Sequence, residues 1–131
     1  MIKITSFWTL FLLNVITASS LNVQAQNWSG TYYRNKANGK VVIREGKKSK
    51  QRAIDFNLSV GNPPPYLCIG KLDGYAQWIT ANIAEYNVGF NTESDSCRLT
   101  FIFSSNQLIV RETNCDAHHG VSCNFEGLYS R

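Results

Sequence analysis

The chain carries the same short phrase near its start and at its end, and this repeat constrains the fold more than any other feature. Residues 28–34 read Trp-Ser-Gly-Thr-Tyr-Tyr-Arg, and residues 125–131 read Phe-Glu-Gly-Leu-Tyr-Ser-Arg. Both follow the pattern aromatic-x-Gly-x-Tyr-x-Arg, with the period of two expected of a β-strand. Glycine inside a strand usually marks a bend or a close backbone approach. Two strands that bend at the same phase, one first and one last, predict a sheet that curls until its ends meet.

The N-terminal segment has the pattern of a secretory signal peptide. Lys3 supplies a positive charge, residues 7–16 form an apolar run, and Val23 and Ala25 have the spacing of a signal-peptidase site. The apolar run is shorter than the roughly 20 residues that a membrane span requires, so no transmembrane segment is expected. We therefore expect residues 1–25 to be a cleaved signal and residues 26–131 to form one domain, periplasmic or secreted.

Four cysteines lie beyond the predicted signal, at positions 68, 97, 115 and 123. An even number of cysteines in an exported chain indicates two disulfides. Among the three possible pairings, the favoured one joins Cys115 to Cys123, which closes a short local loop, and Cys68 to Cys97, which ties neighbouring strands. Each bond is expected to stabilise the fold by about 2–4 kcal/mol.

Alternating apolar and polar residues predict about eight short strands, most clearly over residues 54–60 and 97–103. Residues 78–84 are also expected to be strand, and no segment predicts a convincing helix. The sequence therefore predicts an all-β fold, a small antiparallel β-barrel of about eight strands stapled by disulfides. Polar turns are expected at residues 45–50, 73–74 and 91–95.

The formal net charge of +4 is concentrated in residues 34–52, where eight basic residues accompany a single acidic one, Glu45. This segment is either a solvated hairpin tip or a patch for an acidic protein, an anionic glycan or a membrane surface. Lys47, Lys48 and Lys50 are its candidate binding residues. Nucleic acid is not expected as a partner, because no aromatic residues interleave with the lysines as a base-stacking platform requires.

The segment 115–123 holds two cysteines and two histidines, the residue types of a tetrahedral zinc site. The paired spacings of such sites are absent, and adjacent histidines point to different sides of an extended backbone, so no metal or other cofactor is expected. The segment is interpreted as a solvated loop with two exposed histidines or as a partner-contacting loop, and any contact that His118 and His119 make is expected to depend on pH. No catalytic arrangement of nucleophile, base and acid is evident, so no enzymatic activity is expected.

An exported all-β chain of this size with strand-tying cysteines resembles the small bacterial periplasmic lysozyme inhibitors. The segment Cys97-Arg98-Leu99-Thr100-Phe101 and the ending Gly127-x-Tyr129-x-Arg131 resemble exported domains found near such inhibitors. Inhibitors of this type insert a Ser-Gly-x-Tyr or Ser-Gly-x-x-Tyr loop into the lysozyme cleft, and Ser29-Gly30-Thr31-Tyr32-Tyr33 fits either spelling.

The resemblance implies a non-enzymatic inhibitor of lysozyme or another cell-wall hydrolase, with Ser29, Gly30, Tyr32 and Tyr33 at the contact. We expect the protein to be a monomer. An immunity protein against a periplasmic toxin and a barrel that binds a small ligand are the alternatives.

Overall fold

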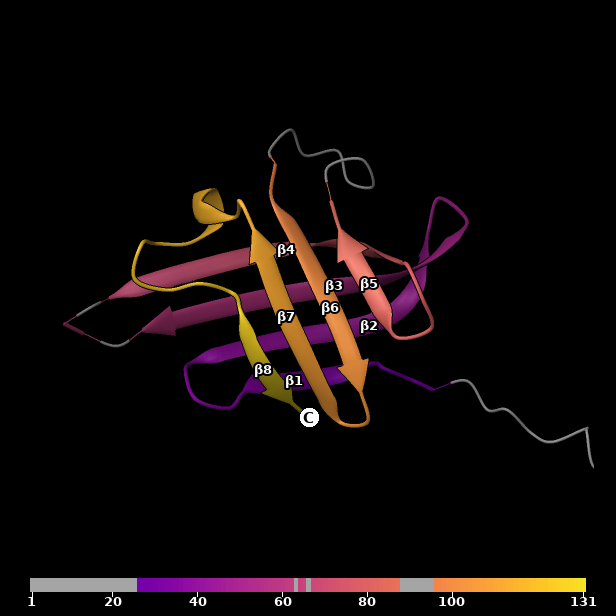
Figure 1. Ribbon diagram of the computed structural model, residues 1–131, viewed down its shortest axis with the longest axis horizontal. Coiled ribbons are helices and arrows are strands. Elements are labelled where there is room, and N and C mark those ends of the chain that lie inside the picture. The colour runs from indigo at the N-terminus through magenta and orange to yellow at the C-terminus, as the bar shows by residue number, and fades with distance from the viewer. Residues whose placement is uncertain (1–25, 63, 66, 88–95) are drawn as a thin grey trace, which may run out of the picture.

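The computed structural model describes residues 26–62, 64–65, 67–87 and 96–131, and its strands form a closed antiparallel barrel (Figure 1). The strands follow one another around the barrel in sequence order, and the last pairs with the first. The predicted fold class is confirmed, as is the meeting of the two strands that carry the terminal repeat. The strands are β1 (Gly30–Arg34), β2 (Gly39–Lys48), β3 (Gln51–Asn62), β4 (Cys68–Trp78), β5 (Ile83–Tyr86), β6 (Arg98–Ser104), β7 (Gln107–Thr113) and β8 (Gly127–Ser130).

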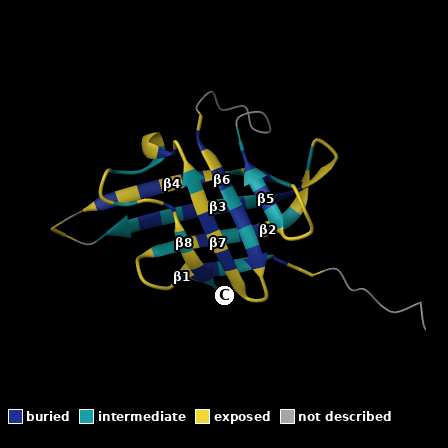
Figure 2. Ribbon diagram, viewed as in Figure 1, coloured by how far each residue is buried: buried dark blue, intermediate teal, exposed yellow. Residues whose placement is uncertain are grey.

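Side chains fill the inside of the barrel. In Figure 1 the shorter strands β5 to β8 cross in front of the long strands β2, β3 and β4, and Figure 2 shows buried and exposed residues alternating along them. The interior of a barrel of eight strands is just wide enough for side chains. Its largest fully buried members are Tyr32, Tyr86, Tyr129, Phe56, Phe101, Phe103, Phe125, Ile43, Ile54, Leu58, Leu99 and Leu108.

Strand pairing overrides two predicted turns. β2 continues to Lys48, and only Ser49 and Lys50, both with positive φ, connect it to β3. The pair at 73–74 lies inside β4, where each residue pairs with β3. The expected strand at 78–84 is strand only at its ends, because Trp78 ends β4 and Ile83 begins β5, while residues 79–82 form the bend between them. Hydrogen bonds to the partner strand outweigh the local preference for a turn. The turn predicted at 91–95 lies outside the described residues.

The terminal repeat forms the seam at which the barrel closes. Gly30 and Gly127 have φ values of 150° and 155°, which side chains rarely allow. Each glycine lies beneath the arginine of the other copy: a Cβ on Gly30 would be 3.3 Å from Cδ of Arg131, and one on Gly127 would be 2.8 Å from Cδ of Arg34. The two strands thus exchange arginine side chains across the seam.

Each arginine binds the carbonyl groups on either side of the other copy's aromatic residue. Because a guanidinium presents several donors in a rigid fork, one side chain holds two backbone oxygens at once. The bonds run from Arg34 Nη1 to Asn124 O (2.7 Å) and Glu126 O (3.1 Å), and from Arg131 Nη1 and Nη2 to Ser29 O (2.8 Å) and Asn27 O (3.1 Å).

The tyrosines of the repeat fasten each copy internally. The hydroxyl of Tyr32 donates to the carbonyl of Trp28, and the hydroxyl of Tyr129 donates to that of Phe125, both at 2.8 Å. Burial raises the pKa of Tyr129 to about 12, so its hydroxyl remains a donor. The two copies therefore share one hydrogen-bonding pattern, although each begins with a different aromatic residue.

The symmetry extends to the strands beside the seam. Glu45 of β2 accepts the amide of Trp28 at 2.9 Å, and Glu112 of β7 accepts the amide of Phe125 at 2.6 Å. The return bonds match as well, because the Glu45 amide donates to Ser29 Oγ and the Glu112 amide donates to the carboxylate of Glu126. The repeat therefore positions Glu112, which holds the loop described below.

The close packing at the seam predicts that one added methyl group there lowers the stability of the fold, whereas one added elsewhere does not. Gly127→Ala places a Cβ at a positive φ and against the Arg34 side chain, so we expect a loss of about 1–3 kcal/mol in the free energy of unfolding. Gly46→Ala is the control, because a Cβ there would meet nothing within 4 Å, and it should change stability by less than about 0.5 kcal/mol. Urea denaturation of both variants measures this, and equal stabilities would contradict the role of the seam.

Candidate functional site

The disulfides join Cys68 to Cys123 and Cys97 to Cys115, so the favoured pairing is wrong. Cys97 precedes β6 and Cys115 follows β7, and these strands are antiparallel neighbours, which brings the two cysteines to one end of the barrel. Cys68 begins β4, and the loop between β7 and β8 brings Cys123 across to it. Register and loop path decided the pairing, whereas closeness in sequence favoured Cys115 and Cys123.

Both disulfides hold the segment between β7 and β8, residues 114–126. The bonded cysteines are 55 and 18 positions apart in the sequence. For loops of these lengths the chain-entropy model gives a stabilisation of about 4 and 3 kcal/mol. Two disulfides are consistent with an oxidising, extracytoplasmic compartment. Cys115 and Cys123 are both oxidised, so neither supplies a thiolate for the tetrahedral zinc arrangement that the composition of this loop resembles.

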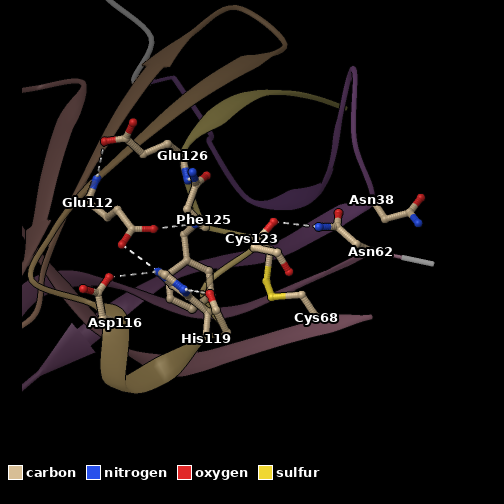
Figure 3. Close-up of a disulfide and its surroundings, with 12 residues drawn as sticks. Asn38, Asn62, Cys68, Glu112, Asp116, His119, Cys123, Phe125 and Glu126 are labelled. Carbon is tan, nitrogen blue, oxygen red and sulfur yellow. Dashed lines mark hydrogen bonds and ion pairs between the residues drawn. A yellow bond between two sulfur atoms is a disulfide. The ribbon is translucent and has the colours of Figure 1, made fainter. Parts of the chain in front are cut away.

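His119 is the centre of this loop (Figure 3). Its Nε2 lies 2.9 Å from Oε2 of Glu112, and its Nδ1 lies 2.7 Å from the carbonyl oxygen of Gly120. Its ring meets Phe125 edge-on, with ring centroids 5.1 Å apart, and its backbone bridges to Gly70 of β4. The loop therefore packs over the end of the barrel. The buried imidazole of His119 joins the loop to β7 through Glu112.

The partners of His119 favour its protonated form. A carboxylate and a carbonyl are both acceptors, so both ring nitrogens donate only when the imidazole carries two protons. Burial lowers the pKa of His119, but the hydrogen bonds to Glu112 and Gly120, together with the negative charges of Glu112 and Asp116, outweigh it and raise the pKa above its usual value. His118, the other predicted histidine, is half-buried and ends the short 3-10 turn Asp116–His118.

Three ligand-type side chains meet at this point. Atoms of Glu112, Asp116 and His119 lie within 4.8 Å of one another, with 3.9 Å between His119 Nε2 and Asp116 Oδ1. Glu112 already accepts from the Phe125 amide and from His119, so the arrangement is complete as an ion pair. His119 is a candidate from the sequence, whereas Glu112 is not, because its only local signal is its position near the end of an alternating strand.

The residues of the predicted inhibitor motif do not form a common exposed loop in the barrel. Tyr32 is fully buried, Gly30 lies beneath Arg131, and Ser29 Oγ accepts the amide of Glu45. Tyr33 alone among these points outward, with 59% of its surface exposed. The motif therefore presents one aromatic side chain on the barrel wall.

The predicted lysines lie at the tip of the β2–β3 hairpin. Lys47 and Lys50 are exposed, while the ammonium of Lys48 lies 5.0 Å from the ring centre of Tyr75. Other cations of the basic segment are engaged: Arg44 pairs with Asp55 at 3.5 Å, and Arg34 belongs to the seam. The basic segment is therefore divided among separate parts of the surface.

A second basic surface lies on the outer wall formed by β1 to β4. Tyr33 pairs with Lys40, Lys40 with Ser59, and Ser59 with Lys71, so these four residues form one row across four strands. Strands are about 4.8 Å apart, which places the two lysines about 10 Å apart on either side of Ser59. We call this row the lysine row.

The lysine row borders a hollow of about 430 Å³. Asn57 and Asp73, which pair with each other in the next row, also line it, and a second hollow adjoins it beside Tyr33, Lys40 and Ser59. Neither lysine forms a salt bridge with a described residue. Lys71 is not among the residues predicted from the sequence, because its place in the row with Lys40 depends on strand register.

Comparison of the chain with models of known families, with curated proteins and with solved structures gives no significant match. Among the described residues, no helix has the length and apolar composition needed to cross a lipid bilayer. The site must therefore be interpreted from its own geometry.

The His119 network predicts a pH-dependent contribution to stability. Because the folded-state pKa lies above the unfolded value of about 6.5, the contribution is fully present below about pH 6.5 and is lost as the pH rises through the folded-state pKa. The stability difference between the wild type and His119→Gln should therefore be largest below about pH 6.5 and shrink as the pH rises through the folded-state pKa in denaturant titrations. A constant difference for His119→Gln would contradict the prediction.

Proposed function

We propose that the protein is an exported, non-enzymatic binding protein that holds an anionic glycan on the outer wall of β1 to β4. The observation that carries the proposal is the lysine row, in which Lys40 and Lys71 flank Ser59 beside a hollow and have no acidic partner among the described residues. Ammonium groups that are not held in ion pairs attract carboxylate, phosphate or sulfate groups.

The neighbouring side chains suit a sugar as well as its charge. Asn57 and Ser59 offer amide and hydroxyl groups to sugar hydroxyls, and Asp73 offers an acceptor. Tyr33 combines an exposed apolar ring with a hydroxyl, a combination that serves at polar binding surfaces. A charged sugar polymer would meet cations, hydrogen-bonding groups and an aromatic ring along one row.

The interior of the barrel supports binding on the outside. Its aromatic and aliphatic side chains are fully buried, and Trp28 stacks on Phe103 at 5.3 Å toward one end. At the other end the loop of His119 packs against Phe125 and Gly70. The alternative of a small ligand inside the barrel has no comparable support from the described residues.

Charge reversal in the lysine row tests the proposal. Lys40→Glu/Lys71→Glu should weaken binding to polygalacturonate at least 10-fold in calorimetry at low salt, because two attractive contacts become repulsive. Lys47→Glu/Lys50→Glu is the matched control, since it makes the same change in net charge on the hairpin tip, about 23 Å further along β2. Binding by the control should stay within about 3-fold of wild type. Equal losses in both variants, or no binding by the wild type at micromolar concentration, would overturn the proposal.

Inhibition of a cell-wall hydrolase remains a prediction from the resemblance, and an immunity role remains its alternative. In this structure an inhibitor would have to act through Tyr33, the exposed member of the motif. A lysozyme turbidity assay with the wild type and Tyr33→Ala measures this. Inhibition by the wild type that Tyr33→Ala weakens would support it, and no inhibition of c-, g- or i-type enzymes would exclude it.

A further inference from the structure

Exposed aliphatic side chains gather where the Cys68–Cys123 disulfide joins β4 to the loop. Leu67 and Ile69, on either side of Cys68, are 68% and 71% exposed, and Val121 is fully exposed. The two segments are in contact, because a Cβ on Gly120 would lie 2.7 Å from Sγ of Cys68. We call Leu67, Ile69 and Val121 the aliphatic rim.

The segments that carry the aliphatic rim contain no charged residue. Neither residues 61–70 nor residues 120–124 include Asp, Glu, Lys, Arg or His, and Pro64 and Pro65 add further exposed apolar surface. The two segments are also bonded to each other, since Asn62 Nδ2 donates to the carbonyl of Ser122 at 2.8 Å. Exposed apolar surface without interspersed charge marks a contact with a partner or a membrane.

Basic side chains lie next to the aliphatic rim on the barrel wall. Lys71 follows Ile69 on the outer face of β4, and Lys40 lies in the same row as Lys71. Two residues of strand correspond to about 7 Å, so the lysine row lies about 7 Å behind Ile69. Lys36 is exposed in the connection after β1, which touches the rim segments through the bond from the Gly61 amide to the carbonyl of Asn38.

Among the described residues, the acidic groups near this end lie in the row behind the lysines or are hydrogen-bonded within the loop of His119. Asp73 belongs to the row behind the lysines, and Glu112 is paired with His119. Asp116 is exposed but lies beside His119, on the far side of the loop from Asn62 in Figure 3. An apolar edge with cations one row behind it has the charge and depth profile of a surface that meets anionic lipid, where apolar groups enter by about 5–10 Å.

We propose that the aliphatic rim enters the acyl region of an anionic glycolipid membrane while the lysine row holds the charged sugar headgroup. This inference rests on the proposed function and deepens it, because it names the source of the glycan. The disulfide between Cys68 and Cys123 holds both segments of the rim together before binding. Preorganised contacts bind with a smaller loss of conformational entropy.

Vesicle co-sedimentation tests this inference with the full-length mature protein. The probes are phosphatidylcholine vesicles with and without lipopolysaccharide, and the lipid-free oligosaccharide released from the same lipopolysaccharide. We expect the wild type to bind the lipopolysaccharide vesicles at least 10-fold more tightly than either the plain vesicles or the free oligosaccharide. Equal affinity for vesicles and free oligosaccharide would overturn the inference.

The variant Ile69→Ser/Val121→Ser should lose at least 10-fold in affinity for lipopolysaccharide vesicles and keep its binding to polygalacturonate. Its matched control is Ile79→Ser/Ile109→Ser, which alters exposed aliphatic residues away from the rim and should bind vesicles like the wild type. Thermal melts of both variants establish that they are folded.

The failure of each proposal has its own signature. Unchanged vesicle binding by the rim variant, or equal losses in both variants, would overturn lipid docking and leave polygalacturonate binding intact. If the wild type does not bind polygalacturonate, the proposed function is overturned, and this inference is overturned with it.

Discussion

The exchange of arginines across the seam is the interaction on which the rest of the barrel depends. β1 and β8 pair over only two registered residue pairs, Tyr33 with Ser130 and Arg34 with Tyr129. So short a ladder holds the barrel closed because Arg34 and Arg131 each reach over a glycine and bind two backbone carbonyls in the segment that leads into the other strand. Closure removes both sheet edges, which would otherwise expose unpaired backbone groups.

The symmetry of the seam supports different structures on its two sides. Glu45 and Glu112 have the same bonds to the two copies of the repeat. Glu45 then lies 4.0 Å from Arg52 on the exposed hairpin, whereas Glu112 binds the buried His119. The two ends of the barrel therefore differ, although the seam is symmetric. One end is filled by aromatic packing, and the other carries the disulfide-bonded loop with the titratable His119. The proposed binding surfaces lie outside this frame, on the wall and edge that it keeps rigid.

Much of the fold could be predicted from periodicity, and most of the candidate site could not. The alternation at 97–103 predicted β6 well, because one face of that strand is buried and the other is not. The turn predicted at 73–74 is wrong, because pairing with β3 outweighs a local turn signal. Lys40 and Lys71 are 31 positions apart, and only the register of β3 against both neighbours makes them part of one row.

By itself the sequence determined that the chain is all-β and that its first and last strands meet, because a shared aromatic-x-Gly-x-Tyr-x-Arg pattern carries its own bend, bond donors and period. Tertiary structure alone decided which cysteines pair, which member of the Ser29–Tyr33 motif is exposed, and that His119 meets Glu112. These outcomes depend on register and on the path of a loop. Both are set by packing and hydrogen bonding between segments far apart in the chain, and neither can be recognised in the local sequence pattern.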